Sequence, residues 1–112
     1  MNSIKNASGA TLRIAGFSGT VTIKDGSARD VRPSVNLLLH DGYTVSTAAG
    51  ASAYVSLDGK NVVKLDASGK ASVEKSGSSL KLNLVSGTMY SGLDAKELSH
   101  VQTSNSATGV RG

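Results

Sequence analysis

ASAYVSLDGKNVVKL, at residues 51–65, is the stretch that decides the fold class. Its first half places a small or apolar side chain at every second position, at Ala51, Ala53, Val55 and Leu57. This period of two is expected of a β-strand that buries one face. Asp58-Gly59 follows, and both residue types tolerate the positive φ that a type I′ turn requires. With the return run at residues 61–65, the segment predicts a β-hairpin.

Short runs of the same kind fill the rest of the chain. Thirteen glycines interrupt them. The further predicted strands lie at residues 11–15, 20–24, 35–39, 43–47, 70–75, 80–84 and 99–103. Turns at this spacing predict an all-β fold of about nine or ten short, mostly antiparallel strands, arranged as a sandwich or roll. The sequence pattern contains no crossover helices, which excludes a parallel α/β sheet.

A regular spacing of turns leaves one alternative architecture open. Asp-Gly pairs stand at 25–26, 41–42 and 58–59, at intervals of sixteen and seventeen residues. A β-solenoid would show such a period. The pairs do not continue beyond position 59 and the sequences around them are dissimilar, so evenly spaced hairpins are the preferred interpretation.

Length and composition predict one domain. The 112 residues are assigned to a single unit, 1–112. Residues 1–10 are polar and turn-prone, which predicts a flexible N-terminal lead without a signal peptide. Residues 104–112 are small and polar, and predict a C-terminal segment cut before a last strand. No apolar run approaches the roughly 18 residues of a membrane span. Cysteine is absent, which excludes disulfides and thiolate metal sites.

The charge of the chain is modest and scattered. Twelve basic and eight acidic residues give a net charge of +4. Nucleic-acid-binding proteins gather such charge on one face. Here the lysines and arginines are spread along the chain, often beside Asp or Glu, as on an ordinary solvated surface. No nucleic acid partner is expected.

Several motifs follow one another in a recognisable order. They are Gly19-Thr20-Val21-Thr22-Ile23, residues 38–47 with Asp41-Gly42 and a closing Thr47, residues 51–59 ending in Asp-Gly, residues 80–89, and Thr103 followed by Val110-Arg111-Gly112. Together they resemble the FecR domain family, named for a protein that relays ferric citrate uptake signals in Gram-negative bacteria. The resemblance covers residues 14–112. It departs at Ser104, where the family has proline, and the family continues past Val-Arg-Gly with a further strand.

The resemblance implies a non-catalytic module outside the cytoplasm, in the periplasm or at the cell surface. Such a module senses or relays a signal by binding a protein partner, either a receptor or an envelope protein. The alternative is a structural or cell-wall-associated surface domain, or a spacer, in a larger exported protein. The parent chain is then expected to be membrane-anchored or surface-anchored, and the domain itself to be a monomer.

Candidate chemical sites are weak. His40-Asp41 beside a serine could be imagined as a hydrolase triad, but no Gly-x-Ser-x-Gly occurs, and a turn histidine is the simpler interpretation. A calcium ion would need six to eight oxygens. Candidate ligands for it are Asp25, Asp41, Asp58 and Asp66, each already explained by its turn. We therefore predict no catalytic, cofactor-binding or metal-binding residues, no cofactor and no enzyme activity.

Candidate partner-binding residues come from the aromatic side chains and from the C-terminal motifs. Tyr43 and Tyr54 lie on neighbouring predicted strands and could face the same way, but packing in the core or at its rim is the preferred interpretation for both. The resemblance adds Thr103, Val110 and Arg111 beside the expected free strand edge, since an unpaired edge offers backbone groups to another chain.

Overall fold

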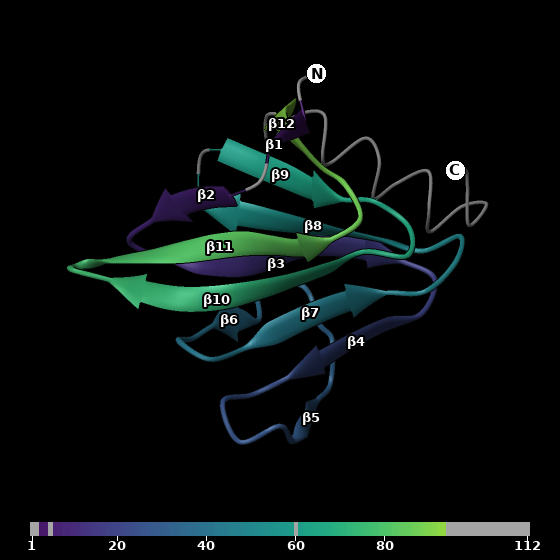
Figure 1. Ribbon diagram of the computed structural model, residues 1–112, viewed down its shortest axis with the longest axis horizontal. Coiled ribbons are helices and arrows are strands. Elements are labelled where there is room, and N and C mark those ends of the chain that lie inside the picture. The colour runs from purple at the N-terminus through teal and green to yellow at the C-terminus, as the bar shows by residue number, and fades with distance from the viewer. Residues whose placement is uncertain (1–2, 5, 60, 94–112) are drawn as a thin grey trace.

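The computed structural model describes residues 3–4, 6–59 and 61–93. These residues form two antiparallel sheets of six strands each, which face one another across a shared core (Figure 1). The prediction of an all-β, sandwich-like fold is confirmed. Every strand pair among the described residues is antiparallel, which contradicts the solenoid alternative, because a β-solenoid stacks its coils in parallel.

Each sheet gathers strands from distant parts of the chain. In spatial order the first sheet consists of β1 (Ser3–Ile4), β12 (Met89–Leu93), β9 (Asn61–Leu65), β8 (Ser52–Leu57), β3 (Leu12–Ser18) and β6 (Leu38–Leu39). The second sheet consists of β2 (Asn6–Gly9), β11 (Ser79–Ser86), β10 (Lys70–Ser76), β7 (Thr44–Thr47), β4 (Val21–Lys24) and β5 (Asp30–Val31). The strands β5 and β6 therefore form the two edges on one side of the sandwich, and β1 and β2 form those on the other.

Two tight hairpins follow the turn residues in the sequence. Between β8 and β9, Asp58 has a φ of 56° and Gly59 a φ of 72°, as a type I′ turn requires. Between β10 and β11, Gly77 has a φ of 62°. The hairpin predicted from residues 51–65 is confirmed, and its register pairs Val55 with Val63.

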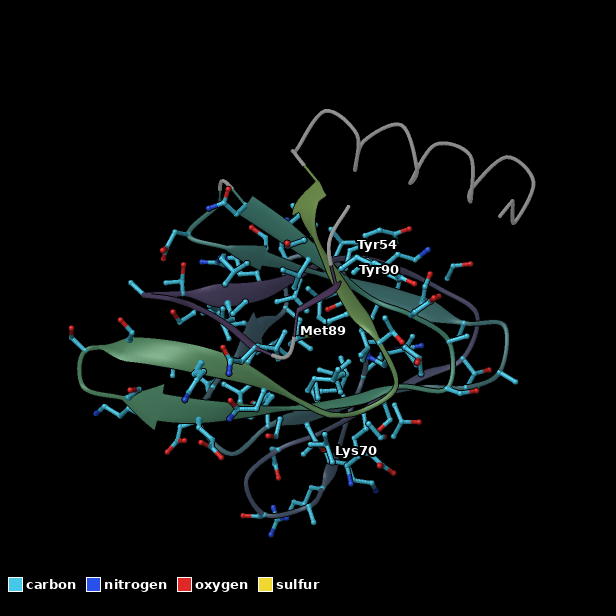
Figure 2. The ribbon with its side chains drawn as sticks, turned by 45° about the horizontal axis from the view of Figure 1, so that its top comes forward. Tyr54, Lys70, Met89 and Tyr90 are labelled. Atoms are coloured by element: carbon cyan, nitrogen blue, oxygen red, sulfur yellow. The ribbon has the colours of Figure 1, made fainter. Side chains whose placement is uncertain are left out.

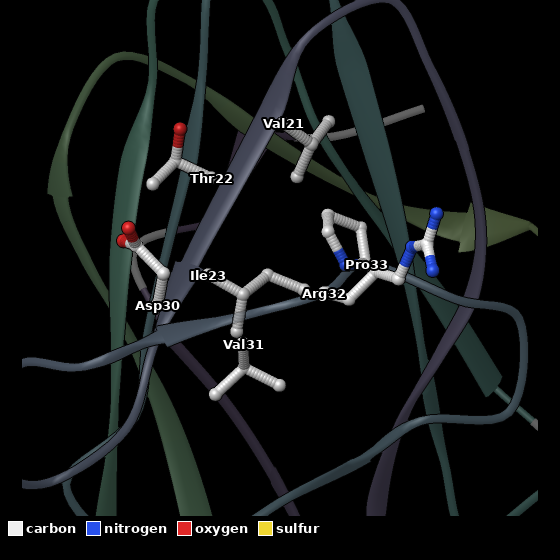
Figure 3. Close-up of a pocket in the computed structure, with 7 residues that line it drawn as sticks. All are labelled: Val21, Thr22, Ile23, Asp30, Val31, Arg32 and Pro33. Carbon is white, nitrogen blue, oxygen red and sulfur yellow. The ribbon is translucent and has the colours of Figure 1, made fainter.

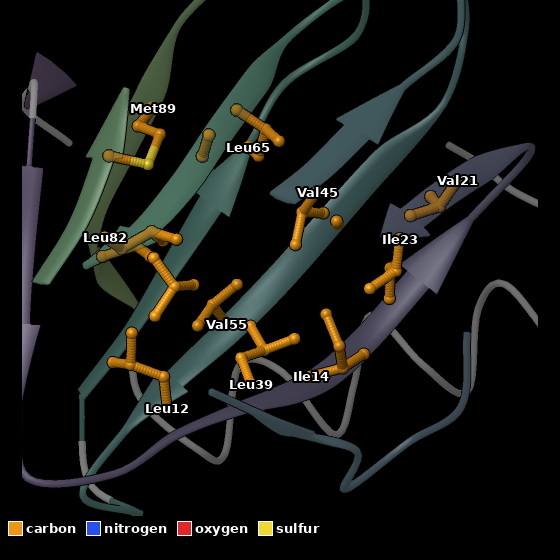
Figure 4. Packing of buried hydrophobic residues seen from close by; sticks show 14 of the residues in the cluster. Leu12, Ile14, Val21, Ile23, Leu39, Val45, Val55, Leu65, Leu82 and Met89 are labelled. Carbon is orange, nitrogen blue, oxygen red and sulfur yellow. The ribbon is translucent and has the colours of Figure 1, made fainter. Parts of the chain in front are cut away.

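The core lies between the sheets and takes alternate residues from strands such as β3, β7, β8 and β10. Leu12 and Ile14 of β3 are fully buried, as are Val45 of β7 and Leu82 of β11. Figure 4 shows these side chains converging from the two sheets. Burying apolar area stabilises the fold by about 25 cal/mol per Å². The alternation seen in the sequence therefore describes the sheet faces correctly.

A buried hydroxyl ties the two sheets together at the end of β7. The Thr47 hydroxyl donates to the Asp66 carbonyl over 2.6 Å and accepts from the Gly69 N–H over 2.8 Å. Asp66 follows β9 of the first sheet, whereas Gly69 precedes β10 of the second. Thr47 exposes only 6% of its surface, so these bonds are shielded from water.

The prediction of a flexible lead at residues 1–10 is wrong for the residues that the structure describes there. Asn6–Gly9 forms β2, which pairs with β11 in a register that joins Leu82 to Ala7. Ser3–Ile4 forms β1 and pairs with β12. Propensity alone gives Asn, Ser and Gly a low strand tendency, and pairing with a distant strand overrides it.

The strand predicted at residues 35–39 is shorter in the structure, where only Leu38–Leu39 is a strand. Asn36 takes a φ of 72°, which interrupts an extended backbone. Its N–H donates to the Ile14 carbonyl over 2.6 Å, while the Ile14 N–H donates to the Leu37 carbonyl over 2.9 Å. Val35 is left 53% exposed.

Candidate functional site

The structure separates the two tyrosines that were considered as partner-binding residues. Tyr43 precedes β7 in the second sheet and packs against the central core. Tyr54 lies in β8 of the first sheet, and its neighbours Ala53 and Val55 face that core instead. The two rings do not share a surface, because the chain crosses from one sheet to the other between β7 and β8.

The remaining predicted partner-binding residues, Thr103, Val110 and Arg111, lie outside the residues that the structure describes. Their proposed role therefore stays a prediction.

Tyr54 belongs to a small cluster on the outer face of the first sheet. The register places Tyr54, Lys64 and Tyr90 in one row across β8, β9 and β12. Tyr54 packs with Ala15 and Val62, and all three are buried. Both tyrosines lie on one side of the molecule, with Lys70 of the second sheet on the opposite side (Figure 2). Because Tyr54 is only 6% exposed, its ring acts mainly in packing.

His40 and Asp41 occupy a turn, and each already has a contact. The His40 ring meets the Tyr43 ring edge to face, with 5.4 Å between the centroids. The Asp41 carboxylate accepts the backbone N–H of Lys75 over 2.9 Å. This bond anchors the turn before β7 to β10, which gives Asp41 a structural role.

The aspartates considered as calcium ligands are used at separate turns. Asp58 accepts the Thr11 N–H over 2.9 Å, and Asp66 accepts the Ala67 N–H over 2.9 Å. Asp25 accepts the N–H groups of Arg29 and Ser27, and these bonds hold its pKa below the ordinary value of 3.8. Within residues 3–4, 6–59 and 61–93, no three His, Cys, Asp or Glu side chains gather as metal ligands.

A row of polar residues crosses the outer face of the second sheet, one from each of its six strands. One continuous row of paired residues runs from β2 to β5: Asn6, Asn83, Ser72, Thr44, Lys24 and Asp30. Lys24 and Asp30 close this row with an ion pair of 2.8 Å. Such a polar row is usual on the solvent side of an antiparallel sheet.

A groove of about 480 Å³ lies beside the edge strand β5 (Figure 3). Its floor is apolar and comes from both β4 and β5, with Ile23 and Val31 next to one another in the register. Arg32 and Asp30 stand at its rim, and Pro33 closes one end (Figure 3). Apolar surface with a few polar groups around it is the usual composition of a binding groove.

The backbone of β5 offers free hydrogen-bonding groups beside this groove. The Asp25 N–H donates to the Arg29 carbonyl, which makes Asp25 and Arg29 a bonded pair of the β4–β5 ladder. Bonded and non-bonded pairs alternate along an antiparallel ladder, so the backbone groups of Asp30 and Arg32 point away from β4. Among the described residues, none accepts the Arg32 N–H.

A second hollow, of about 340 Å³, lies on the other side of the sandwich, between β2 and β9. It is lined by Ala7, Ser8, Leu57, Asn61, Val62, Val63 and Ser91, none of which is charged. The β5 groove differs by its charged rim.

The β5 groove was not found by the sequence analysis, although one signal for it exists. Pro33 is the single proline of the chain and directly follows Asp30-Val31-Arg32. Proline within an alternating run indicates an edge strand, since it cannot donate to a neighbour. The groove itself depends on how β4 and β5 meet the crossing segment, residues 32–37, which connects β5 to β6 of the first sheet. No local sequence pattern encodes that arrangement.

Comparisons with known protein families, with curated proteins and with solved structures found no match for this chain.

Proposed function

We propose that this chain is a non-catalytic protein-binding module of the FecR type, which works outside the cytoplasm and senses or relays a signal by contacting a protein partner. The observation that carries the proposal is the free edge of β5 with its apolar groove. Exposed strand edges are a common means of protein recognition, because a partner's backbone completes the ladder. The ordered motifs at residues 19–23, 38–47 and 51–59 support the family assignment.

The geometry of the polar side chains agrees with a binding role better than with a catalytic one. The carboxylates of Asp25, Asp41 and Asp58 each accept backbone N–H groups at turns, which commits them to structure. A catalytic site needs an acid, base or nucleophile free to act on a substrate. The groove instead combines apolar surface, one unpaired backbone donor and a guanidinium group.

A second candidate function is a structural or cell-wall-associated surface domain. The polar outer face of the second sheet favours it, since hydroxyl and amide side chains such as Thr44, Ser72 and Asn83 can hydrogen-bond to a hydrated polymer. This face lies opposite the buried cluster around Tyr54.

An amide chemical-shift titration of the isotope-labelled chain tests the proposal. The panel holds a candidate receptor signalling domain, peptidoglycan fragments, calcium and single-stranded DNA. Shifts at residues 30–32 with the protein probe support the binding module. Shifts on the outer face around Thr44 and Ser72 with cell-wall fragments support the surface domain. Shifts with none of the panel would refute protein binding by this chain for the partners offered and favour a passive spacer.

A further inference from the structure

We infer that the groove beside β5 binds a short extended peptide segment, which pairs with β5 as an added strand and carries an acidic side chain next to an apolar one. The inference rests on the proposed protein-binding function and names the chemistry of the partner.

The backbone requirement comes from the ladder at the edge of the second sheet. The outward groups of Asp30 and Arg32 lie on either side of Val31, two residues apart, which is the spacing of two successive bonded pairs in an antiparallel ladder. An incoming strand satisfies the free Arg32 N–H and gains the carbonyls beside it. The crossing segment leaves the sheet at Pro33, which has no N–H, so the added strand is short.

The apolar requirement comes from the groove floor. Val31 points inward and is only partly buried, whereas Ile23, its partner on β4, and Val21 belong to the core. A peptide residue paired with Val31 points the same way, because side chains directly opposite one another share a sheet face. An aliphatic side chain at that position covers Val31 and removes it from water.

The acidic requirement comes from Arg32. The Asp30 carboxylate at the rim is already paired with Lys24 at 2.8 Å. Arg32 is exposed and forms no ion pair or side-chain hydrogen bond with any residue in the described part of the chain. Its guanidinium group lies on the same outer face as a peptide side chain paired with it. A carboxylate there is complementary, and a planar bidentate contact with arginine is available to it.

A second copy of this chain is a poorer occupant. Two β5 edges placed side by side would bring Arg29 and Arg32 of each copy together, and like charges oppose such pairing. The strand is also only two residues long and is followed by Pro33, and these are features that prevent sheets from joining edge to edge. A separate peptide with a carboxylate meets neither obstacle.

The test uses the full isotope-labelled chain and two acetylated, amidated heptapeptides. Both alternate valine with a polar residue, which is glutamate in one peptide and glutamine in the other. We expect the glutamate peptide to shift the amides of residues 21–23 and 30–32, and to bind about two- to fivefold more tightly than the glutamine peptide, the range of one exposed ion pair.

Three variants separate the contribution of the Arg32 charge from that of the Arg32 backbone N–H. Arg32→Gln should erase the preference for glutamate and leave the glutamine peptide unaffected. Arg32→Pro also removes the N–H donor and should weaken both peptides. Lys75→Gln removes the same charge on β10, which lies two strands from β4 and three from β5, and should leave both affinities unchanged. Thermal unfolding midpoints of all three variants verify that they are folded.

The outcomes distinguish this inference from the function on which it rests. Equal affinity of the two peptides, or an equal loss with Lys75→Gln, overturns the acidic preference. Failure of both peptides while a receptor domain still shifts residues 30–32 overturns the peptide inference and leaves protein binding standing. Failure of peptides and receptor domain together overturns both. Dilution-dependent shifts at residues 30–32 without peptide would show self-association there and overturn the choice of occupant.

Discussion

Thr47→Val is the substitution that most directly tests how the two sheets are joined. Valine keeps the shape of the side chain and replaces the hydroxyl with a second methyl group. The Asp66 carbonyl then loses its donor at 2.6 Å, and the buried Gly69 N–H loses its acceptor at 2.8 Å. The perturbation is thus a loss of polar contacts with almost no change in volume.

The expected cost follows from these two contacts. A buried donor left without an acceptor costs about 1–3 kcal/mol, and losing the second bond adds about 1 kcal/mol. We expect Thr47→Val to lower the free energy of unfolding by about 3 kcal/mol. Thr47→Ser is the matched control, because it keeps the hydroxyl and loses one methyl group, worth about 1 kcal/mol.

Urea denaturation followed by circular dichroism measures both variants. With a slope of about 1–2 kcal/mol per M, the midpoint of Thr47→Val should fall by roughly 1.5–3 M and that of Thr47→Ser by well under half as much. If the serine variant were the less stable of the two, packing of the methyl group would dominate at this site. The argument that the hydroxyl ties the sheets together would then be wrong.

Three further predictions concern a turn, the core and the response to acid, and the first two each have a matched control variant. Gly87→Ala should cost about 3 kcal/mol in a urea titration, since a Cβ there lies 2.6 Å from the Gly69 Cα; Gly50→Ala, with the same backbone sign and open space, should cost about 1 kcal/mol. Leu82→Ala should lower the free energy of unfolding by about 3 kcal/mol. Val85→Ala, on the same strand but exposed, should lower it by under about 0.5 kcal/mol. Equal losses would contradict the core assignment. The lowered pKa of Asp25 stabilises the fold above about pH 4, and that contribution disappears as the pH falls through the lower folded pKa, so Asp25→Asn should show a shallower loss of stability between pH 4 and pH 2. Identical acid profiles of variant and wild type would refute the role of Asp25.

Local patterns predicted the parts of the fold that local chemistry controls. The hairpin at residues 51–65 could be predicted from alternation and from Asp58-Gly59, because a short turn limits the register of the strands on either side of it. The strands β4, β7, β10 and β11 were likewise visible as alternating runs. The interior face of each was also predictable, since burial follows the same alternation.

Long-range pairing was not predictable in this way. β2 reads Asn-Ala-Ser-Gly and gains strand structure only from β11, which follows much later in the chain. The division of strands between two sheets separates Tyr43 from Tyr54, although they stand on consecutive strands. The groove at Val31 and Arg32 depends on the same division. It forms where the chain leaves β5, at the edge of the second sheet, and crosses to β6 of the first sheet.

The pairing of β2 with β11 also has a consequence for synthesis. About seventy positions separate Gly9 from its partner Leu80, and the separation between β1 and its partners Met89 and Tyr90 is longer still. At a ribosomal rate of about 5–20 residues per second, the first strands leave the exit tunnel several seconds before their partners exist. Both sheets can close on this side only after β11 and β12 have been translated. The strands β1 and β2 precede their partners by most of the described chain and are therefore among the last to pair during synthesis.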